Sequence, residues 1–252
     1  MQDIYIDDQG KGIPLVLIHG FLGSSKMWEP QINFFKDYFR VITPDIPGFG
    51  KSNKVKSHDS ILSMASTLLD CIERKKIKNF YLLGHSMGGM VAQEMAKKVG
   101  NKILKLICYS TGSIGEMPGR FETVEKSRNN LKKKGLNIMV KKIAKTWFVK
   151  GGGAKYFDIC IESGNESSFE AADNALKAFQ KWNGVKSLKN IKNKTLIIWG
   201  DKDKSYNFNQ IKILKSNIKD SKVLIFKGCA HNIHLEQSRQ FNLKVKNFLL
   251  RN

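Results

Sequence analysis

The amino-acid sequence predicts an α/β fold, in which a mostly parallel, doubly wound sheet carries a helical cap insertion. Short apolar runs rich in β-branched and aromatic residues alternate with amphipathic stretches in the first and last parts of the chain. This alternation is typical of parallel strands that are covered by helices on both faces. The length of 252 residues suits one core domain with an insertion.

The expected strands are brief, and most of them adjoin a stretch with helical periodicity. Strands are predicted at residues 15–18, 41–42, 80–83, 103–109, 195–199 and 223–226. Helices are predicted at residues 28–39, 61–74, 87–99 and 241–250. Because the strands are continuous apolar runs and the helices repeat with a period near 3.6, the two kinds of element can be told apart.

The alternation stops after Tyr109, and about 80 residues pass before the next expected strand. Segments 120–134, 136–147 and 169–182 have helical patterns, which Gly151-Gly152-Gly153 interrupts. A structureless loop of that length is uncommon in a compact domain. We therefore expect a helical cap at residues 113–183, inserted into a core formed by residues 1–112 and 184–252.

The formal net charge of +21 raises the hypothesis of a nucleic-acid or anionic-membrane binder, since such a field attracts polyanions without any motif. The lysines are spread along the whole chain, however. Arginine, the side chain favoured for specific phosphate contacts, is confined to Arg40, Arg74, Arg120, Arg128, Arg239 and Arg251. We expect no specific nucleic-acid partner, although anionic small molecules would arrive faster, an effect that salt weakens.

Composition also disfavours other classes of protein. No stretch of about 20 apolar residues occurs, so no membrane span is expected. Met1-Gln2-Asp3 does not open a basic segment followed by an apolar one, which favours the cytoplasm over secretion. The scattered cysteines are expected to be buried free thiols: Cys71, Cys108, Cys160 and Cys229. The sequence carries no signal for the oligomeric state.

Ser86 is the strongest candidate for a catalytic residue, because it lies where an expected strand turns sharply into an expected helix. It stands in the segment Gly84-His85-Ser86-Met87-Gly88. The flanking glycines let the backbone pass close to its neighbours, which lifts the serine into a strained, exposed position above a helix N-terminus. This arrangement presents a weak alcohol as a nucleophile.

A serine nucleophile needs a base, and the base needs an acid that orients it. Asp203 follows the expected strand 195–199, and His231 lies just beyond the expected strand 223–226. The carboxyl ends of parallel strands meet at one edge of a sheet, where ligands bind in such folds. We therefore expect Ser86, Asp203 and His231 to project from that edge. Their order along the chain, Ser then Asp then His, is that of the catalytic triad in α/β-hydrolases.

With these residues in place, the chain resembles an α/β-hydrolase over essentially its full length. His19-Gly20-Phe21-Leu22-Gly23 resembles the oxyanion-loop motif of that family. Residues 45–52, which read Asp-Ile-Pro-Gly-Phe-Gly-Lys-Ser, resemble its D-x-x-G-x-G-x-S turn. Gly200-Asp201-Lys202-Asp203 resembles its G-x-x-D acid loop, and the separation of 28 positions between Asp203 and His231 is typical of it.

The resemblance implies a serine hydrolase that uses no cofactor and no metal. Ser86 would attack a carbonyl carbon, His231 would accept and later return the proton, and Asp203 would hold the imidazole in the required tautomer. The backbone N–H groups of Phe21 and Met87 would stabilise the tetrahedral oxyanion. A small-molecule ester or lactone is the expected partner.

Several of these assignments have competitors in the sequence. Asp201 is a second acid in the same loop, although the family spacing favours Asp203. His234 lies three residues beyond the expected base, and His85 adjoins the nucleophile, so both are rival bases to His231. A metal held by His231 and His234 would need further ligands that we do not identify.

Two tryptophans, Trp147 and Trp182, are candidates for the wall of a substrate pocket beneath the cap, although tryptophan on an amphipathic helix more often serves packing. The start of the cap, Ser110-Thr111-Gly112, and the pair Trp147-Phe148 are similar to those of 3-oxoadipate enol-lactonases and related small-ester hydrolases. The lysine content of the cap and its triple glycine depart from that pattern.

A serine at this turn argues against haloalkane dehalogenases and epoxide hydrolases, which carry aspartate there in the family. We expect hydrolysis of a small carboxylic ester, lactone or thioester through an acyl-enzyme on Ser86. One alternative is a C–C bond hydrolase that acts on ring-cleavage diketones. Another is a non-catalytic receptor for a small molecule on the same fold.

Overall fold

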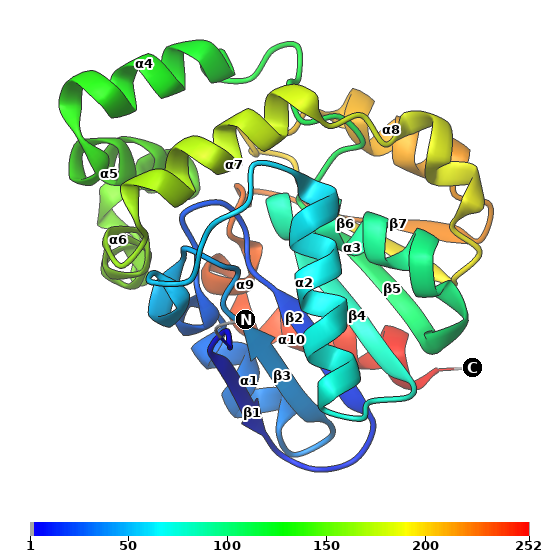
Figure 1. Cartoon of the computed structure of the whole chain (residues 1–252). Coiled ribbons are helices and arrows are strands. Elements are labelled where there is room, and N and C mark those ends of the chain that lie inside the picture. Colours follow the sequence, from blue (N-terminus) through cyan, green and yellow to red (C-terminus); the bar gives the residue numbers. More distant parts are fainter. Residues whose placement is uncertain (1–2, 252) are drawn as a thin grey trace.

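A computed structural model describes residues 3–251, and its strands form one seven-stranded sheet (Figure 1). The strands are β1 (Ile6–Gln9), β2 (Pro14–Ile18), β3 (Arg40–Pro44), β4 (Phe80–His85), β5 (Ile103–Tyr109), β6 (Thr195–Gly200) and β7 (Ser221–Phe226). Their order across the sheet is β1-β3-β2-β4-β5-β6-β7. All neighbours pair in parallel except β1 and β3. The predicted sheet is confirmed, with an added antiparallel edge strand.

Helices cover both faces of the sheet, as Figure 1 shows. The helices of the core are α1 (Glu29–Phe35), α2 (Ile61–Arg74), α3 (Met87–Val99), α8 (Phe208–Asn217), α9 (Ile233–Glu236) and α10 (Ser238–Leu250). Leu15 and Leu17 of β2 pack with residues of α1 and α10. Val16 and Ile18, which alternate with them, belong to the apolar cluster on the other face, together with residues of α2 and α3. The strand is therefore apolar on both faces, because both faces are covered.

Short 3-10 turns complete the connections, at Ser25–Trp28, Gly50–Ser52, Gly100–Lys102, Gly151–Gly153 and Val185–Asn190. The triple glycine, Gly151–Gly153, thus forms a tight turn between two helices of the insertion. Within the described part of the chain, none of the helices combines the length and the apolar character needed to cross a bilayer. All four cysteines are buried and free, which confirms that prediction.

The long interval between β5 and β6 folds into four helices: α4 (Val124–Lys134), α5 (Leu136–Thr146), α6 (Phe157–Asn165) and α7 (Phe169–Lys181). The sequence predicted α4, α5 and α7 close to these bounds, but it did not predict α6. The residues at the two ends of this interval lie side by side. The Gly115 N–H donates to the Trp182 carbonyl over 3.0 Å, and the Gly184 N–H donates to the Ser113 carbonyl over 2.8 Å.

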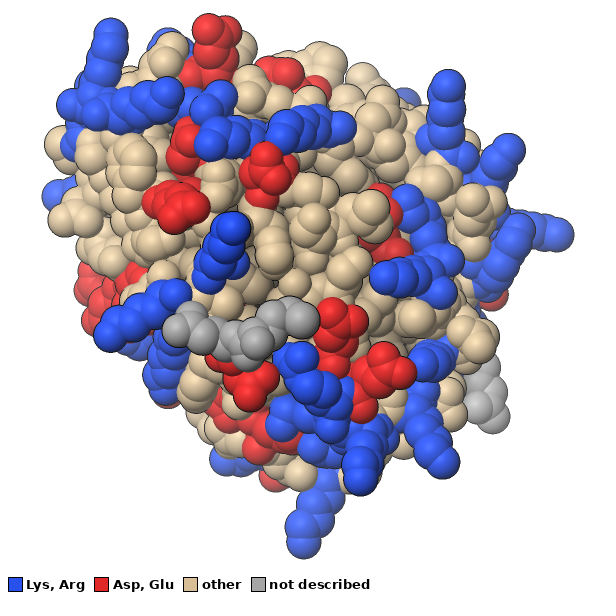
Figure 2. Space-filling model, in the orientation of Figure 1, with Lys and Arg blue, Asp and Glu red and all other residues tan. Residues whose placement is uncertain are grey.

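Charged side chains are distributed over the surface. On the face shown in Figure 2, lysine and arginine form several separate groups, mostly near its edges, and aspartate and glutamate lie among them. Several lysines and arginines pair with acidic residues, as Arg128 does with Asp173 over 2.8 Å in the cap. The visible face thus shows dispersed positive charge rather than one continuous basic stripe.

Candidate active site

Ser86 occupies the turn between β4 and α3, and its backbone is strained. Its φ is 54° and its ψ is −117°, a conformation that residues other than glycine rarely adopt. Close packing leaves no room for side chains beside it. A Cβ at Gly84 would clash with the Gly88 carbonyl, and a Cβ at Gly88 would clash with the carbonyls of Ile18 and His19. The glycines flanking Ser86 are therefore required by sterics.

Asp203 and His231 form a buried hydrogen-bonded pair. Nδ1 of His231 lies 2.9 Å from Oδ2 of Asp203, and their side chains are 3% and 0% exposed. The other carboxylate oxygen accepts hydrogen bonds from the backbone N–H groups of Ser205 (2.7 Å) and Tyr206 (3.2 Å). The loop after β6 thus orients the carboxylate. With its Nδ1 proton held by the carboxylate, the imidazole presents Nε2 as the proton acceptor.

The rival acid lies elsewhere. Asp201 is exposed, and its Oδ1 accepts a hydrogen bond of 2.7 Å from the Gly228 N–H. This contact joins the loop after β6 to the loop after β7. The structure therefore gives Asp201 a part in loop packing, whereas Asp203 contacts the histidine.

The rival histidines are buried, and within residues 3–251 neither forms an ion pair with an acidic side chain. His85 lies with Nε2 3.3 Å from the His231 carbonyl oxygen, and its ring is stacked on Tyr109 at 4.6 Å. Burial holds the pKa of His85 well below its ordinary value. The Tyr109 hydroxyl lies 3.0 Å from Nδ1 of His234, and burial lowers the pKa of His234 to about 3. Both rings are neutral packing groups at neutral pH.

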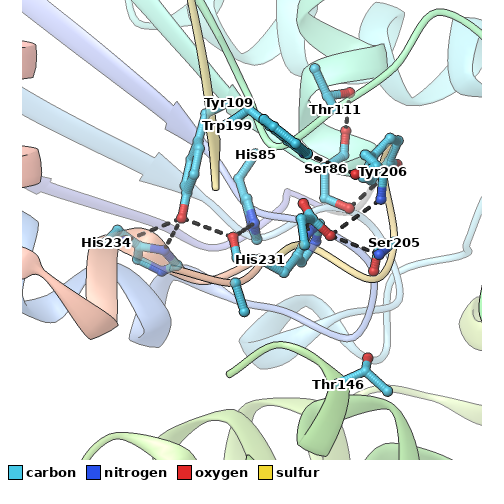
Figure 3. A network of polar contacts seen from close by, with 12 residues as sticks. His85, Ser86, Tyr109, Thr111, Thr146, Trp199, Ser205, Tyr206, His231 and His234 are labelled. Atoms are coloured by element: carbon cyan, nitrogen blue, oxygen red, sulfur yellow. Dashed lines mark hydrogen bonds and ion pairs between the residues drawn. The ribbon is translucent and has the colours of Figure 1, made fainter. Parts of the chain in front are cut away.

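Ser86 lies in the same pocket as His231, but no hydrogen bond joins the two side chains. The partner of Ser86 Oγ is instead the Tyr206 hydroxyl, at 3.5 Å (Figure 3). The Tyr206 ring also stacks on His231, with centroids 5.7 Å apart and planes 8° apart. Tyr206 is a site residue that sequence reasoning missed. Its position three residues after Asp203, in a loop at the same sheet edge, was the available signal.

Two backbone N–H groups beside Ser86 have no hydrogen-bond partner among residues 3–251: those of Phe21 and Met87. Met87 begins α3, where the first amides of a helix lack intrahelical partners. The loop that carries Phe21 lies against the nucleophile, because a Cβ at Gly20 would be 3.0 Å from the Ser86 Cβ. These two N–H groups are therefore placed to donate hydrogen bonds to an oxyanion that forms at Ser86.

His19 holds that loop in place rather than facing a substrate. Its Nδ1 lies 2.8 Å from the Gly20 carbonyl oxygen, and its Nε2 accepts a hydrogen bond of 3.0 Å from the Ile46 N–H. This pattern corresponds to the neutral ring with the proton on Nδ1. Burial lowers the pKa of His19, which agrees with that neutral state.

The D-x-x-G-x-G-x-S turn is also structural. The buried Asp45 carboxylate accepts hydrogen bonds from the N–H groups of Ser25 (2.5 Å) and Lys51 (2.8 Å). The Ser52 hydroxyl accepts one from the Tyr5 N–H over 2.9 Å. The motif therefore ties loops at the sheet edge to one another and contributes no group to the pocket.

The pocket between Ser86 and the cap is narrow, with a cavity volume of about 30 Å³. Trp147 lines it, and its ring centroid lies 6.4 Å from that of His231. Trp182 does not line it: the Trp182 indole N–H donates to Glu94 over 2.8 Å, at the base of the cap. The expectation that Trp182 forms part of the pocket is thus corrected, because a buried carboxylate holds its indole elsewhere.

The fold and this site define a hydrolase, and comparison with known proteins identifies the family. A family model described as alpha/beta hydrolase fold matches residues 13–145. The chain belongs to the α/β-hydrolase fold family. This confirms the resemblance to that family that the sequence indicated.

Several relatives of this chain are named as hydrolases, and they act on different kinds of bond. The chain is 28% identical to a pimeloyl-[acyl-carrier protein] methyl ester esterase of Legionella pneumophila, over 98% of this chain and 99% of the relative. It is 26% identical to a 2-hydroxy-6-oxononadienedioate/2-hydroxy-6-oxononatrienedioate hydrolase of Comamonas testosteroni, over 98% and 91%. An esterase structure from Exiguobacterium antarcticum has a TM-score of 0.92 at 24% identity, over 98% and 96%. The protein is an α/β-hydrolase enzyme.

Proposed function

We propose that this enzyme hydrolyses a small carboxylic ester, lactone or thioester through an acyl-enzyme on Ser86. The observation that carries the proposal is the buried His231–Asp203 pair, 2.9 Å apart, in the same pocket as a serine on a strained turn. An imidazole oriented by a carboxylate beside a serine is the arrangement that activates a hydroxyl for acyl transfer.

In the acylation step, Ser86 Oγ forms a bond to the carbonyl carbon while its proton passes to Nε2 of His231. The carbonyl oxygen becomes an oxyanion, which the N–H groups of Phe21 and Met87 stabilise. Asp203 stabilises the imidazolium that forms. When the tetrahedral intermediate collapses, the bond to the leaving oxygen or sulfur breaks and His231 returns the proton to it.

In the deacylation step, a water molecule loses its proton to His231 and attacks the acyl carbon. The bond to Ser86 Oγ then breaks, and the proton returns to the serine. Before either step, the Ser86 hydroxyl must turn from Tyr206 towards His231, a rotation about one side-chain bond. Hydrogen bonds of catalytic residues often tighten only when substrate is bound.

The cap supplies the wall opposite the nucleophile. We infer that residues 113–183 form this cap, and the paired backbone at Ser113 and Gly184 supports these boundaries. Trp147 contributes an aromatic surface beside His231. Because the cavity holds about 30 Å³, an ester of several carbon atoms enters only when side chains of the cap or of the Tyr206 loop move apart.

The test compares the wild type with Ser86→Ala on a panel of methyl esters, p-nitrophenyl esters, lactones and thioesters. Turnover should fall by about 10⁶-fold, as when the serine of such a triad is removed, with an unchanged melting temperature. Ser205→Ala is the matched control, because Ser205 lines the same pocket but binds Asp203 through its backbone. Normal turnover by Ser86→Ala would refute the proposal.

The second candidate is hydrolysis of a C–C bond in a ring-cleavage diketone, which the similarity to the Comamonas enzyme favours. Turnover of a 2-hydroxy-6-oxodienoate faster than of every ester would select this reaction. A fluorophosphonate probe tests for a non-catalytic receptor, since it labels only an activated serine. Absence of labelling at Ser86, with no turnover of any substrate, would support the receptor.

A further inference from the structure

The pocket that contains Ser86 also contains one permanently charged side chain. Among the described residues that line the pocket, Arg120 is the only lysine, arginine, aspartate or glutamate. It lies in the segment that joins β5 to α4, on the cap side of the pocket. Its guanidinium carbon lies 4.4 Å from the centroid of the Phe121 ring, which also lines the pocket. The aromatic ring limits the orientations open to the cation.

One edge of the Arg120 guanidinium is bound to protein and the other is free. Nη1 donates to the Glu122 carbonyl over 2.8 Å and to the Ser127 hydroxyl over 3.1 Å. In the part of the chain that the structure describes, Nε and Nη2 make no hydrogen bond, and no carboxylate forms an ion pair with Arg120. Two parallel N–H donors therefore remain available.

The free edge is the one that the same chain uses elsewhere to bind a carboxylate. Nε and Nη2 of Arg40 hold the two carboxylate oxygens of Asp8 at 2.8 and 2.7 Å. Two parallel N–H groups fit the two oxygens of a carboxylate, which makes such bidentate pairs strong and specific. At Arg120, no carboxylate of residues 3–251 pairs with this edge.

The Glu122 carboxylate forms no ion pair with Arg120, and both of its oxygens have other partners. Oε1 of Glu122 accepts a hydrogen bond of 2.7 Å from the Ser127 hydroxyl. Oε2 accepts hydrogen bonds from Lys142 (2.6 Å) and Asn130 (3.2 Å). Burial lowers the pKa of Arg120, and Tyr206, Glu122 and Glu116 act in the opposite direction. A guanidinium stays protonated in proteins, so an unpaired cation faces the pocket.

We propose that Arg120 binds a carboxylate carried by the substrate. The substrates of this enzyme are therefore esters that also bear one free carboxylate. This proposal rests on ester hydrolysis at Ser86 and specifies its substrate class. The ester carbonyl lies at Ser86, and the distal carboxylate pairs with Nε and Nη2 of Arg120. Half-esters of dicarboxylic acids have this chemistry. The net charge of +21 would further attract such anions.

The kinetic test uses matched substrates. The anionic ones are the monomethyl esters of succinate, glutarate and adipate. Each neutral counterpart is a methyl ester of the same length that ends in an isopropyl group, which copies the shape of a carboxylate without its charge. For Arg120→Leu, kcat/KM should fall at least about tenfold on the half-esters. On the neutral esters it should change by less than about threefold.

Two further variants complete the test. Arg239→Leu is the control, because Arg239 is an exposed residue of α10 and its loss changes the net charge equally. It should leave both substrate series unchanged. Arg120→Lys keeps the charge but loses the paired donors, so it should recover part of the activity on the half-esters. An equal loss on both series, or an equal loss in Arg239→Leu, would overturn the proposal.

A binding measurement separates this inference from the proposed hydrolysis. Monomethyl glutarate is titrated into Ser86→Ala and into the double variant Ser86→Ala with Arg120→Leu, and heat is measured. Binding to the first that weakens at least about tenfold in the second supports the carboxylate site, even where the wild type turns over no ester. Equal binding by both proteins, or no binding by Ser86→Ala, would overturn it.

Discussion

The Tyr206 hydroxyl lies 3.5 Å from Ser86 Oγ, while the Tyr206 ring stacks on His231 with the two planes 8° apart. The hydrogen bond of the proposed nucleophile is therefore directed to a tyrosine rather than to the proposed base. Burial raises the pKa of Tyr206 to about 12, so its hydroxyl keeps its proton at neutral pH. Tyr206 thus competes with His231 for the serine.

Removing the Tyr206 hydroxyl should make Ser86 more available. Tyr206→Phe keeps the ring on His231 but deletes the competing hydrogen bond, which is worth about 1 kcal/mol for a typical neutral pair. We expect the labelling rate of Ser86 by a fluorophosphonate to rise by a few-fold to about tenfold. Tyr38→Phe, an exposed tyrosine, is the control. Slower labelling of Tyr206→Phe would show instead that the hydroxyl assists the reaction.

The two acids of the G-x-x-D loop should differ sharply in effect. Asp203→Asn retains the shape of the side chain but no longer fixes the imidazole tautomer, so kcat should fall by about 10⁴-fold, as for the equivalent change in a serine protease. Asp201→Asn alters an exposed residue that contacts Gly228, and its kcat should change by less than about threefold. The measurement is kcat for ester hydrolysis by the wild type and by both variants. Equal losses would remove Asp203 from the proposed triad.

The buried histidines should make the fold sensitive to mild acid. The pKa of His234 is about 3 in the folded protein against 6.5 for the free side chain. Between these values the unfolded chain binds the proton and the folded chain does not, so stability falls as pH falls. The slope for one such histidine is about 1.4 kcal/mol per pH unit. Urea unfolding at about pH 7 and pH 5.5 measures it.

His85 adds to this acid sensitivity, because burial also lowers its pKa. Replacing one of the two groups tests their contribution. In His234→Gln, the loss of unfolding free energy between about pH 7 and pH 5.5 should be smaller than in the wild type by about 1 kcal/mol. A pH dependence identical to that of the wild type would contradict this explanation.

Close backbone packing predicts that Gly88 tolerates no side chain. A Cβ there would clash with the carbonyl oxygens of Ile18 and His19, so Gly88→Ala should lower the free energy of unfolding by about 1–3 kcal/mol. Gly153→Ala is the matched control, because nothing lies within 4 Å of a Cβ at that position. Chemical denaturation of both variants measures the difference. Equal stability would show that the turn at Ser86 can relax.

Elements with strong local patterns were predictable. The strands at β2 to β7 and the helices α2 and α3 follow continuous apolar runs and helical periodicity, and the structure has them close to the expected bounds. β1 was not predictable in this way, because Ile6–Gln9 carries three polar residues. Its place depends on pairing with β3. Helix α6 was not predictable either, because its buried face includes the small residues Cys160 and Ser163.

Within the site, the sequence predicted residues that each belong to a short local motif. It selected Ser86, Asp203 and His231; in the structure Asp203 lies 2.9 Å from His231, whereas Ser86 contacts Tyr206. It did not identify Tyr206 or Arg120. Neither belongs to a motif, and each gains its importance from a neighbour that is remote in sequence.

The sequence by itself determined most of the strands and helices around the site, the strained serine turn and the family, because these depend on local periodicity and on glycines that sterics require. Only the tertiary structure decided which hydroxyl meets Ser86, which tryptophan lines the pocket and which cation lines it. These properties arise where the sheet edge and the cap bring distant segments within hydrogen-bonding distance. No local pattern specifies the charge or the partners of a side chain at such a meeting point.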